Sequence, residues 1–137
     1  MTIALTQSTS AVDGGTYGSS VAATFGSTPA VNSLITVTGM MTNSDAATIT
    51  VVDNQTPSNT YTVVKNSGAY PHNCFVAYAI ATASTGTLTT TVSWSGGTED
   101  ATIQAQEWSG AATSSVLDVS ANPDRTVGVT VASATTT

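Results

Sequence analysis

Apolar residues recur at every second position in one short segment after another along this chain. The clearest case covers residues 88–94, where Leu88, Val92 and Trp94 have the same parity and hydroxyl side chains fill most of the positions between them. Strict alternation over a few residues is typical of a β-strand that has one face in a core and one face in water. The segment therefore predicts a half-buried strand.

The same period predicts strands in residues 2–6, 20–25, 33–38, 47–52, 60–65, 101–108, 114–119 and 126–132. Glycine, asparagine, aspartate and proline cluster between these segments, as they do in turns. Nowhere does a 3.6-residue apolar period persist for ten residues, so essentially no helix is expected. The pattern predicts an all-β fold, a single β-sandwich of immunoglobulin-like or jelly-roll type with about nine or ten strands. The predicted sandwich comprises residues 1–137 as one domain.

Residues 74–81 break the alternation because they are apolar on both faces. One face would carry Phe75, Ala77, Ala79 and Ala81, and the other Val76, Tyr78 and Ile80. A strand of this kind is expected at the centre of a sheet and covered on both sides, and in an open sandwich the second face would meet a loop or a neighbouring subunit. The segment thus favours a homo-oligomer. Cys74, the single cysteine, is expected to pack here as a small buried hydrophobe.

The amino-acid composition limits the kinds of molecule that this chain is expected to bind. About a third of the residues are threonine or serine, and the only cations are Lys65 and Arg125 against eight carboxylates, for a net charge of −6. Such a charge repels phosphate backbones and anionic lipid surfaces, so neither nucleic acid nor a membrane is an expected partner. No signal-peptide pattern is found in residues 1–10, which predicts synthesis in the cytoplasm. We expect residues 1–10 to serve as a docking arm, and residues 131–137 either to form a flexible tail or to begin a segment that continues in a longer parent chain.

Reactive side chains are scarce. His72 is the only histidine, in a predicted loop, and no Cys/His cluster completes a zinc site. Nucleophile elbows and phosphate-binding glycine loops are absent from the sequence. We therefore predict no catalytic residues, no cofactor and no metal, and a protein that is not an enzyme. Two alternatives stay open: acid catalysis by the pair Glu99 and Asp100, or calcium binding by these two with Asp53 and Asn54.

Glu107 has the parity of Ile103 and Ala105, which places its carboxylate inward at the end of a strand. Buried carboxylates persist where backbone amides or hydroxyls satisfy them. We predict that Glu107 ties a loop to the strand end.

Two aromatic residues are predicted to be exposed. Trp108 shares the face of Thr102, Gln104 and Gln106, and Tyr70 lies in a loop, whereas Trp94 has core parity. Exposed aromatic side chains stack on sugars in carbohydrate-binding sandwiches. Trp108 and Tyr70 are therefore the candidate contacts for a glycan or a protein partner.

Several short stretches, in this order, resemble an immunoglobulin-like β-sandwich module of bacteriophage structural proteins and bacterial surface proteins. They are Asp53-Asn54 with Ser58-Asn59-Thr60-Tyr61, Ala77-Tyr78-Ala79, residues 86–92, Glu107-Trp108-Ser109-Gly110 and Val116-Leu117-Asp118-Val119. The resemblance covers residues 33–121, with Ser58 where glycine is usual. It implies a sandwich fold and a virion or surface setting, and it brings no catalytic residues.

These observations lead to one expected function and one alternative. We expect a non-enzymatic structural protein of a phage virion, a capsid decoration or fibre-like component that buries strand edges and apolar strips against a capsid or tail protein and sister subunits. The alternative is a carbohydrate-binding module of a surface-adhesion protein, which would bind a host-surface glycan.

Overall fold

Eight β-strands and no helix are found in the described part of the chain, which in this computed structural model comprises residues 2–13, 18–42, 48–69, 72–82, 85–95 and 100–116. The strands are β1 (Ala4–Asp13), β2 (Ser20–Thr24), β3 (Leu34–Thr42), β4 (Ile49–Asp53), β5 (Thr62–Ala69), β6 (His72–Ile80), β7 (Thr89–Trp94) and β8 (Ala101–Ser109). The predicted all-β fold is confirmed for these residues. None of them belongs to a helix, and hence none to one long and apolar enough to cross a membrane.

The number of strands is lower than the nine or ten predicted, with eight in the described residues. Residues 114–116 are not in a strand, because Ser115 has a φ of 52° and interrupts the extended backbone. The rest of the predicted strand 114–119, the predicted strand 126–132 and the predicted tail 131–137 lie outside the described residues.

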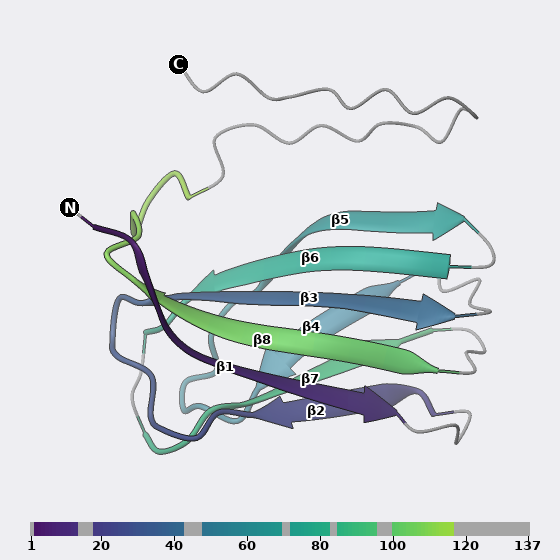
Figure 1. Cartoon of the computed structure of the whole chain (residues 1–137), viewed down its shortest axis with the longest axis horizontal. Coiled ribbons are helices and arrows are strands. Elements are labelled where there is room, and N and C mark those ends of the chain that lie inside the picture. Colours follow the sequence, from purple (N-terminus) through teal and green to yellow (C-terminus); the bar gives the residue numbers. More distant parts are fainter. Residues whose placement is uncertain are drawn as a thin grey trace.

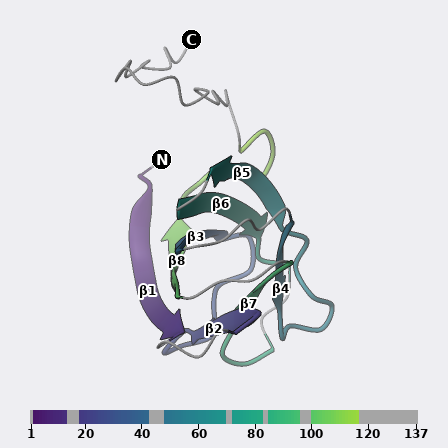
Figure 2. The same cartoon turned by 90° about the vertical axis from the view of Figure 1, so that its right-hand side faces the viewer.

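The strands form two antiparallel sheets that face each other (Figures 1 and 2). The larger sheet has the order β1-β8-β3-β6-β5, and the smaller has the order β2-β7-β4. Figure 2 shows β1 and β2 close together at one side, where the two sheets approach each other. Each sheet therefore has one face toward the other sheet and one outward face.

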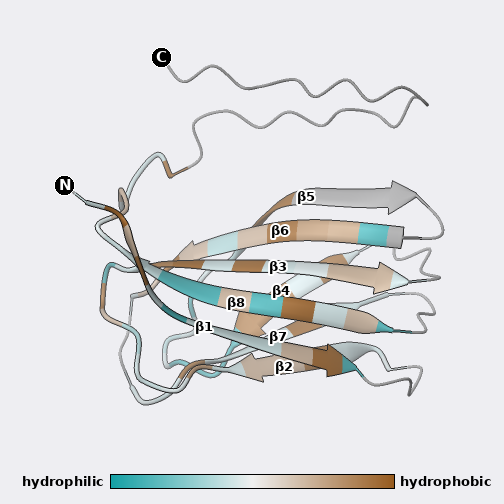
Figure 3. Ribbon diagram, in the orientation of Figure 1, coloured by the Kyte–Doolittle hydropathy of each residue, from teal (hydrophilic) through white to brown (hydrophobic). Residues whose placement is uncertain are grey.

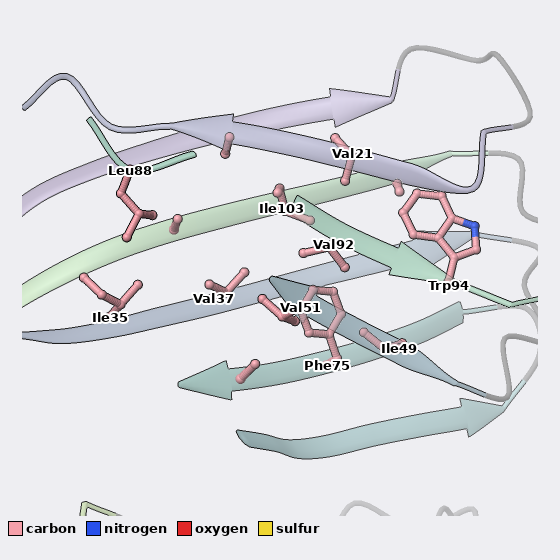
Figure 4. Packing of buried hydrophobic residues seen from close by; sticks show 14 of the residues in the cluster. Val21, Ile35, Val37, Ile49, Val51, Phe75, Leu88, Val92, Trp94 and Ile103 are labelled. Atoms are coloured by element: carbon pink, nitrogen blue, oxygen red, sulfur yellow. The ribbon is translucent and has the colours of Figure 1, made fainter. Parts of the chain in front are cut away.

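The core fills the space between the sheets with the side chains of alternate residues (Figure 4). Leu88, Val92 and Trp94, predicted to share the inward face, are buried, with Trp94 only 6% exposed. Across from them Phe75 is 2% exposed, and it lies opposite Gly39 in the pairing of β3 with β6. A Cβ on Gly39 would collide with the Phe75 ring and with the carbonyl of Thr102, so glycine makes room for the ring.

The expectation that Cys74 is buried is wrong for the described chain, and cover of the second face of β6 by a neighbouring subunit stays a prediction. Phe75, Ala77 and Ala79 face the core, whereas Cys74 and Val76 are exposed and Tyr78 and Ile80 are half-buried. The reason is that only one sheet packs against the strand, so its second apolar face lies outward. His72, expected in a loop, starts this strand.

Residues 4–10, part of the expected docking arm, belong to β1, which pairs with β8 along its length. The register shifts between Leu5 and Gln7, where a bulge interrupts the pairing. Because β1 is an edge strand, its second edge has no strand partner among the described residues. Docking through this segment stays a prediction.

Candidate functional site

The outward face of the five-stranded sheet is the candidate interaction surface. Residues directly opposite each other in antiparallel strands share a face, so the registers define rows that run across β1, β8, β3 and β6. Four such rows make up what we call the outward face. No strand or helix of the described residues lies over it (Figure 1).

The first row, the Trp108 row, is apolar in all four strands. Leu5 lies opposite Trp108, which lies opposite Leu34, and Leu34 lies opposite Ile80. Leu5 is 48% exposed, and the other three are half-buried. The indole Nε1 of Trp108 donates a hydrogen bond of 3.1 Å to Thr36 Oγ1. The ring is thereby oriented along the sheet surface.

The fourth row, the Met40 row, lies toward the opposite ends of the same strands. It consists of Val12, Thr102, Met40 and Cys74. Val12 is 63% exposed and Met40 45%. A shallow hollow of about 460 Å³ beside this row is lined by Ser10, Thr38, Gly39, Met40, Thr102, Ile103 and Gln104. None of these side chains titrates near neutral pH, so the hollow offers a contact surface rather than acid/base chemistry.

Two middle rows separate these apolar ones. They are the Gln106 row of Ser8, Gln106, Thr36 and Tyr78, and the Gln104 row of Ser10, Gln104, Thr38 and Val76. None of the four rows contains an acidic or basic side chain. Figure 3 shows hydrophilic and hydrophobic residues along β8 and β6, with those of the inward and outward faces together. Beyond the rows, β5 carries Lys65 in register with Val76.

Exposed apolar residues concentrate on this face. Among the described residues, seven large apolar side chains are exposed, and four of them, Leu5, Val12, Met40 and Val76, lie in the four rows. The remaining three are Ile3, Val31 and Val52. Exposed apolar residues that gather on one face of a domain commonly mark a contact with another molecule.

Glu107 lies on the reverse side of this sheet and is 2% exposed. Its Oε1 accepts a hydrogen bond of 2.8 Å from the backbone amide of Ala30, and its Oε2 accepts one of 2.7 Å from Gln7 Nε2. Gln7 in turn holds Ser27, whose amide and hydroxyl both donate to Gln7 Oε1. The prediction that Glu107 ties a loop to the strand end is confirmed, and Gln7 extends that tie to β1.

Asp53, an open candidate for calcium, instead holds a loop together. Its carboxylate accepts from the amides of Gln55 and Asn59 at 3.1 and 3.3 Å, from Ser58 Oγ at 3.1 Å, from Asn59 Nδ2 at 2.7 Å and from Tyr61 OH at 3.0 Å. With five donors on it, the carboxylate is already satisfied by its own loop. Burial, and then the charge of Asp53, raise the pKa of Tyr61 well above its ordinary value near 10.

The same loop is joined to a second one by Gln55 and Asn59, both nearly fully buried. Gln55 Oε1 accepts from the amide and hydroxyl of Thr85 at 3.0 and 3.1 Å. Asn59 Oδ1 accepts from the amide and hydroxyl of Thr82 at 2.8 and 3.0 Å. Sequence reasoning missed this network, because paired loops far apart in the sequence leave no periodic signal.

Of the two predicted contact residues, only Trp108 lies within the described chain. Trp108 lies half-buried on the outward face, and Tyr70 lies outside the described residues, as does Glu99 of the predicted acid pair. Asp100 is exposed beside the end of β3, where its backbone carbonyl accepts from the Thr42 amide at 2.9 Å. In the described ranges no three His, Cys, Asp or Glu residues gather in a way that could hold a metal ion. A role for Trp108 and Tyr70 in partner contact stays a prediction.

No family model, curated protein or solved structure matches this chain. The outward face is therefore interpreted from its own geometry and chemistry.

Proposed function

We propose that this chain is a non-enzymatic structural protein of a phage virion, a capsid decoration or fibre-like component. It attaches by burying strand edges and apolar strips against capsid or tail protein and sister subunits. The observation that carries the proposal is the outward face, which has two largely apolar rows and no charged residue in its four rows. Such a surface gains free energy when another protein covers it, at roughly 25 cal/mol per Å² of apolar area.

The strand order supports a jelly roll over an immunoglobulin-like sandwich. In a jelly roll the chain passes back and forth between the two sheets, as it does here from β1 to β4 and again from β6 to β8. An immunoglobulin-like sandwich pairs its first two strands within one sheet, whereas β1 and β2 lie in different sheets here. The order departs from a regular 4+4 jelly roll at β5, which pairs with β6 and enlarges the first sheet.

The virion setting rests on the sequence resemblance, although the strand order is not that of the immunoglobulin-like sandwich which the resemblance implies. Jelly rolls build viral capsid and lectin domains among others, so the fold is compatible with the proposal and does not select it. The resemblance of residues 33–121 to phage structural modules supplies the setting, with synthesis in the host cytoplasm and location in the particle. The strand edges available for attachment in the described residues are those of β1, β5, β2 and β4.

Co-sedimentation with particles tests this function. We expect capsid, portal or tail genes beside the coding sequence, and we expect the purified chain to pellet through a sucrose cushion with particles assembled from the neighbouring capsid gene. Bovine serum albumin in the same tube is the control for trapping. A chain that stays in the supernatant with both capsid and tail particles contradicts the proposal. Glycan-array binding lost in Trp108→Ala would instead favour the carbohydrate-binding alternative.

A further inference from the structure

We infer that the outward face binds a second copy of this chain, so that the two five-stranded sheets pack face to face about a two-fold axis. The inference rests on the proposed function in that it names one of its partners, the sister subunit. It uses the outward face and leaves the strand edges to other contacts.

The distribution of charge over the molecule allows two copies to meet at the outward face. Each copy carries a net charge of −6, so two copies repel each other most where their charged groups approach most closely. The four rows contain no charged side chain, and Lys65 of β5 lies beside them in register with Val76. Carboxylates lie elsewhere, on Glu107 behind the sheet and on Asp53 at the end of β4. The outward face therefore allows contact between like-charged copies with the least electrostatic cost.

The polar rows are self-complementary. Serine and threonine hydroxyls and glutamine amides each donate and accept hydrogen bonds, so a row of them can pair with its own copy. A two-fold contact requires that property, because the same surface patch is presented by both partners. The apolar side chains of the Trp108 and Met40 rows flank the polar rows at both ends of the strands, and both sets are covered together when two faces meet.

The size of the face is sufficient. Four strands about 4.8 Å apart, with eight residues each at about 3.4 Å per residue, give a footprint of about 520 Å². Two such faces bury about 1,040 Å², below the range of about 1,200–2,000 Å² for standard protein–protein interfaces but just above the roughly 1,000 Å² that a specific interface needs. We therefore expect an association that is measurable at micromolar concentrations and is tightened by salt, which screens the repulsion.

Analytical ultracentrifugation of the full chain tests the inference. The variants place an aspartate either on the outward face of the larger sheet or on the solvent side of the smaller sheet. Val76→Asp on β6 and Val12→Asp on the edge strand β1 introduce two like charges into the contact of a symmetric dimer. Val52→Asp is the matched control, because Val52 is 46% exposed on the smaller sheet and Val76 is 40% exposed on the larger. Near- and far-ultraviolet circular dichroism verifies that each variant is folded.

The expected result is a wild-type dimer whose Kd rises at least about 100-fold in Val76→Asp and Val12→Asp and changes by less than about threefold in Val52→Asp. If the wild-type chain stays a monomer up to about 100 μM in about 0.5 M salt, the inference is overturned. The face would then be left to residues 117–137 or to a different protein. Equal weakening by all three variants also overturns the inference. A monomer that pellets with particles refutes only the inference, and a dimer that does not pellet refutes only the proposed function.

Discussion

The two outward faces of the sandwich differ although the strands beneath them alternate in the same way. On the outward face of the smaller sheet lie small or hydroxyl side chains such as Ser20, Thr50 and Thr91. Val52 is the exposed large apolar residue of this sheet in the described chain. On the outward face of the larger sheet lie the Trp108 and Met40 rows. Alternation therefore distinguishes inside from outside, whereas the chemistry of the outward positions distinguishes a hydroxyl-rich face from the more apolar face that we propose a second copy covers.

The largest effect on stability is expected in β6, when a substitution in the core is compared with one at the neighbouring outward residue. Phe75→Ala removes a ring that is 2% exposed, and it should lower the free energy of unfolding by about 3–5 kcal/mol. Its neighbour Val76 points the other way, so Val76→Ala should cost less than about 1 kcal/mol under conditions where the chain is monomeric. Urea unfolding followed by tryptophan fluorescence measures both. Similar losses for the two variants would show that the outward side of β6 is also packed within the monomer.

An intermediate effect is expected at the end of the smaller sheet, where Asp53 gathers five donors. Asp53→Asn keeps the shape but replaces one acceptor oxygen with an amide that faces other donors. We expect a loss of about 2–3 kcal/mol in the free energy of unfolding, because donors lose a charged acceptor. Asp100→Asn is the control, since its side chain is on an exposed residue. A loss for Asp53→Asn that is no greater than the control's would remove the loop network from the account.

The smallest effect concerns pH. Because burial and Asp53 raise the pKa of Tyr61 in the folded state, the unfolded chain releases the Tyr61 proton first as the pH rises. The contribution of Tyr61 to stability is therefore fully present below about pH 10, the pKa of an unfolded tyrosine, and declines above it. Tyr61→Phe should cost about 1 kcal/mol at pH 8 and should flatten the decline between pH 9.5 and about 11. Urea unfolding across that range measures the slopes, and parallel slopes in the two proteins would contradict the assignment.

Much of the fold could be predicted from the sequence because burial leaves a periodic signal. The inward sets around Ile35 and Val92 follow directly from alternation. The first strand was predicted only over residues 2–6, because Ser8, Thr9 and Ser10 offer no apolar residue to mark the period. Its true extent depends on pairing with β8 and on the tie between Gln7 and Glu107, which are 100 residues apart.

The candidate surface could be predicted only in part. The doubly apolar segment of β6 indicated that a second surface needs cover, and the structure shows which side is left outward. Cys74 was misplaced because periodicity assigns parity but not which parity meets the second sheet. The rows themselves come from registers between strands as distant as Leu5 and Trp108, which no local pattern encodes.

Thiol labelling of Cys74 tests the central claim most directly, because this residue belongs to the Met40 row and is exposed in the single chain. The rate of reaction with a thiol reagent is measured as the protein concentration rises through the association midpoint. We predict that the rate falls as the wild-type faces meet, and that it stays at its dilute value in Val76→Asp at every concentration. A wild-type rate that is independent of concentration while a dimer forms would show that the copies meet through another surface.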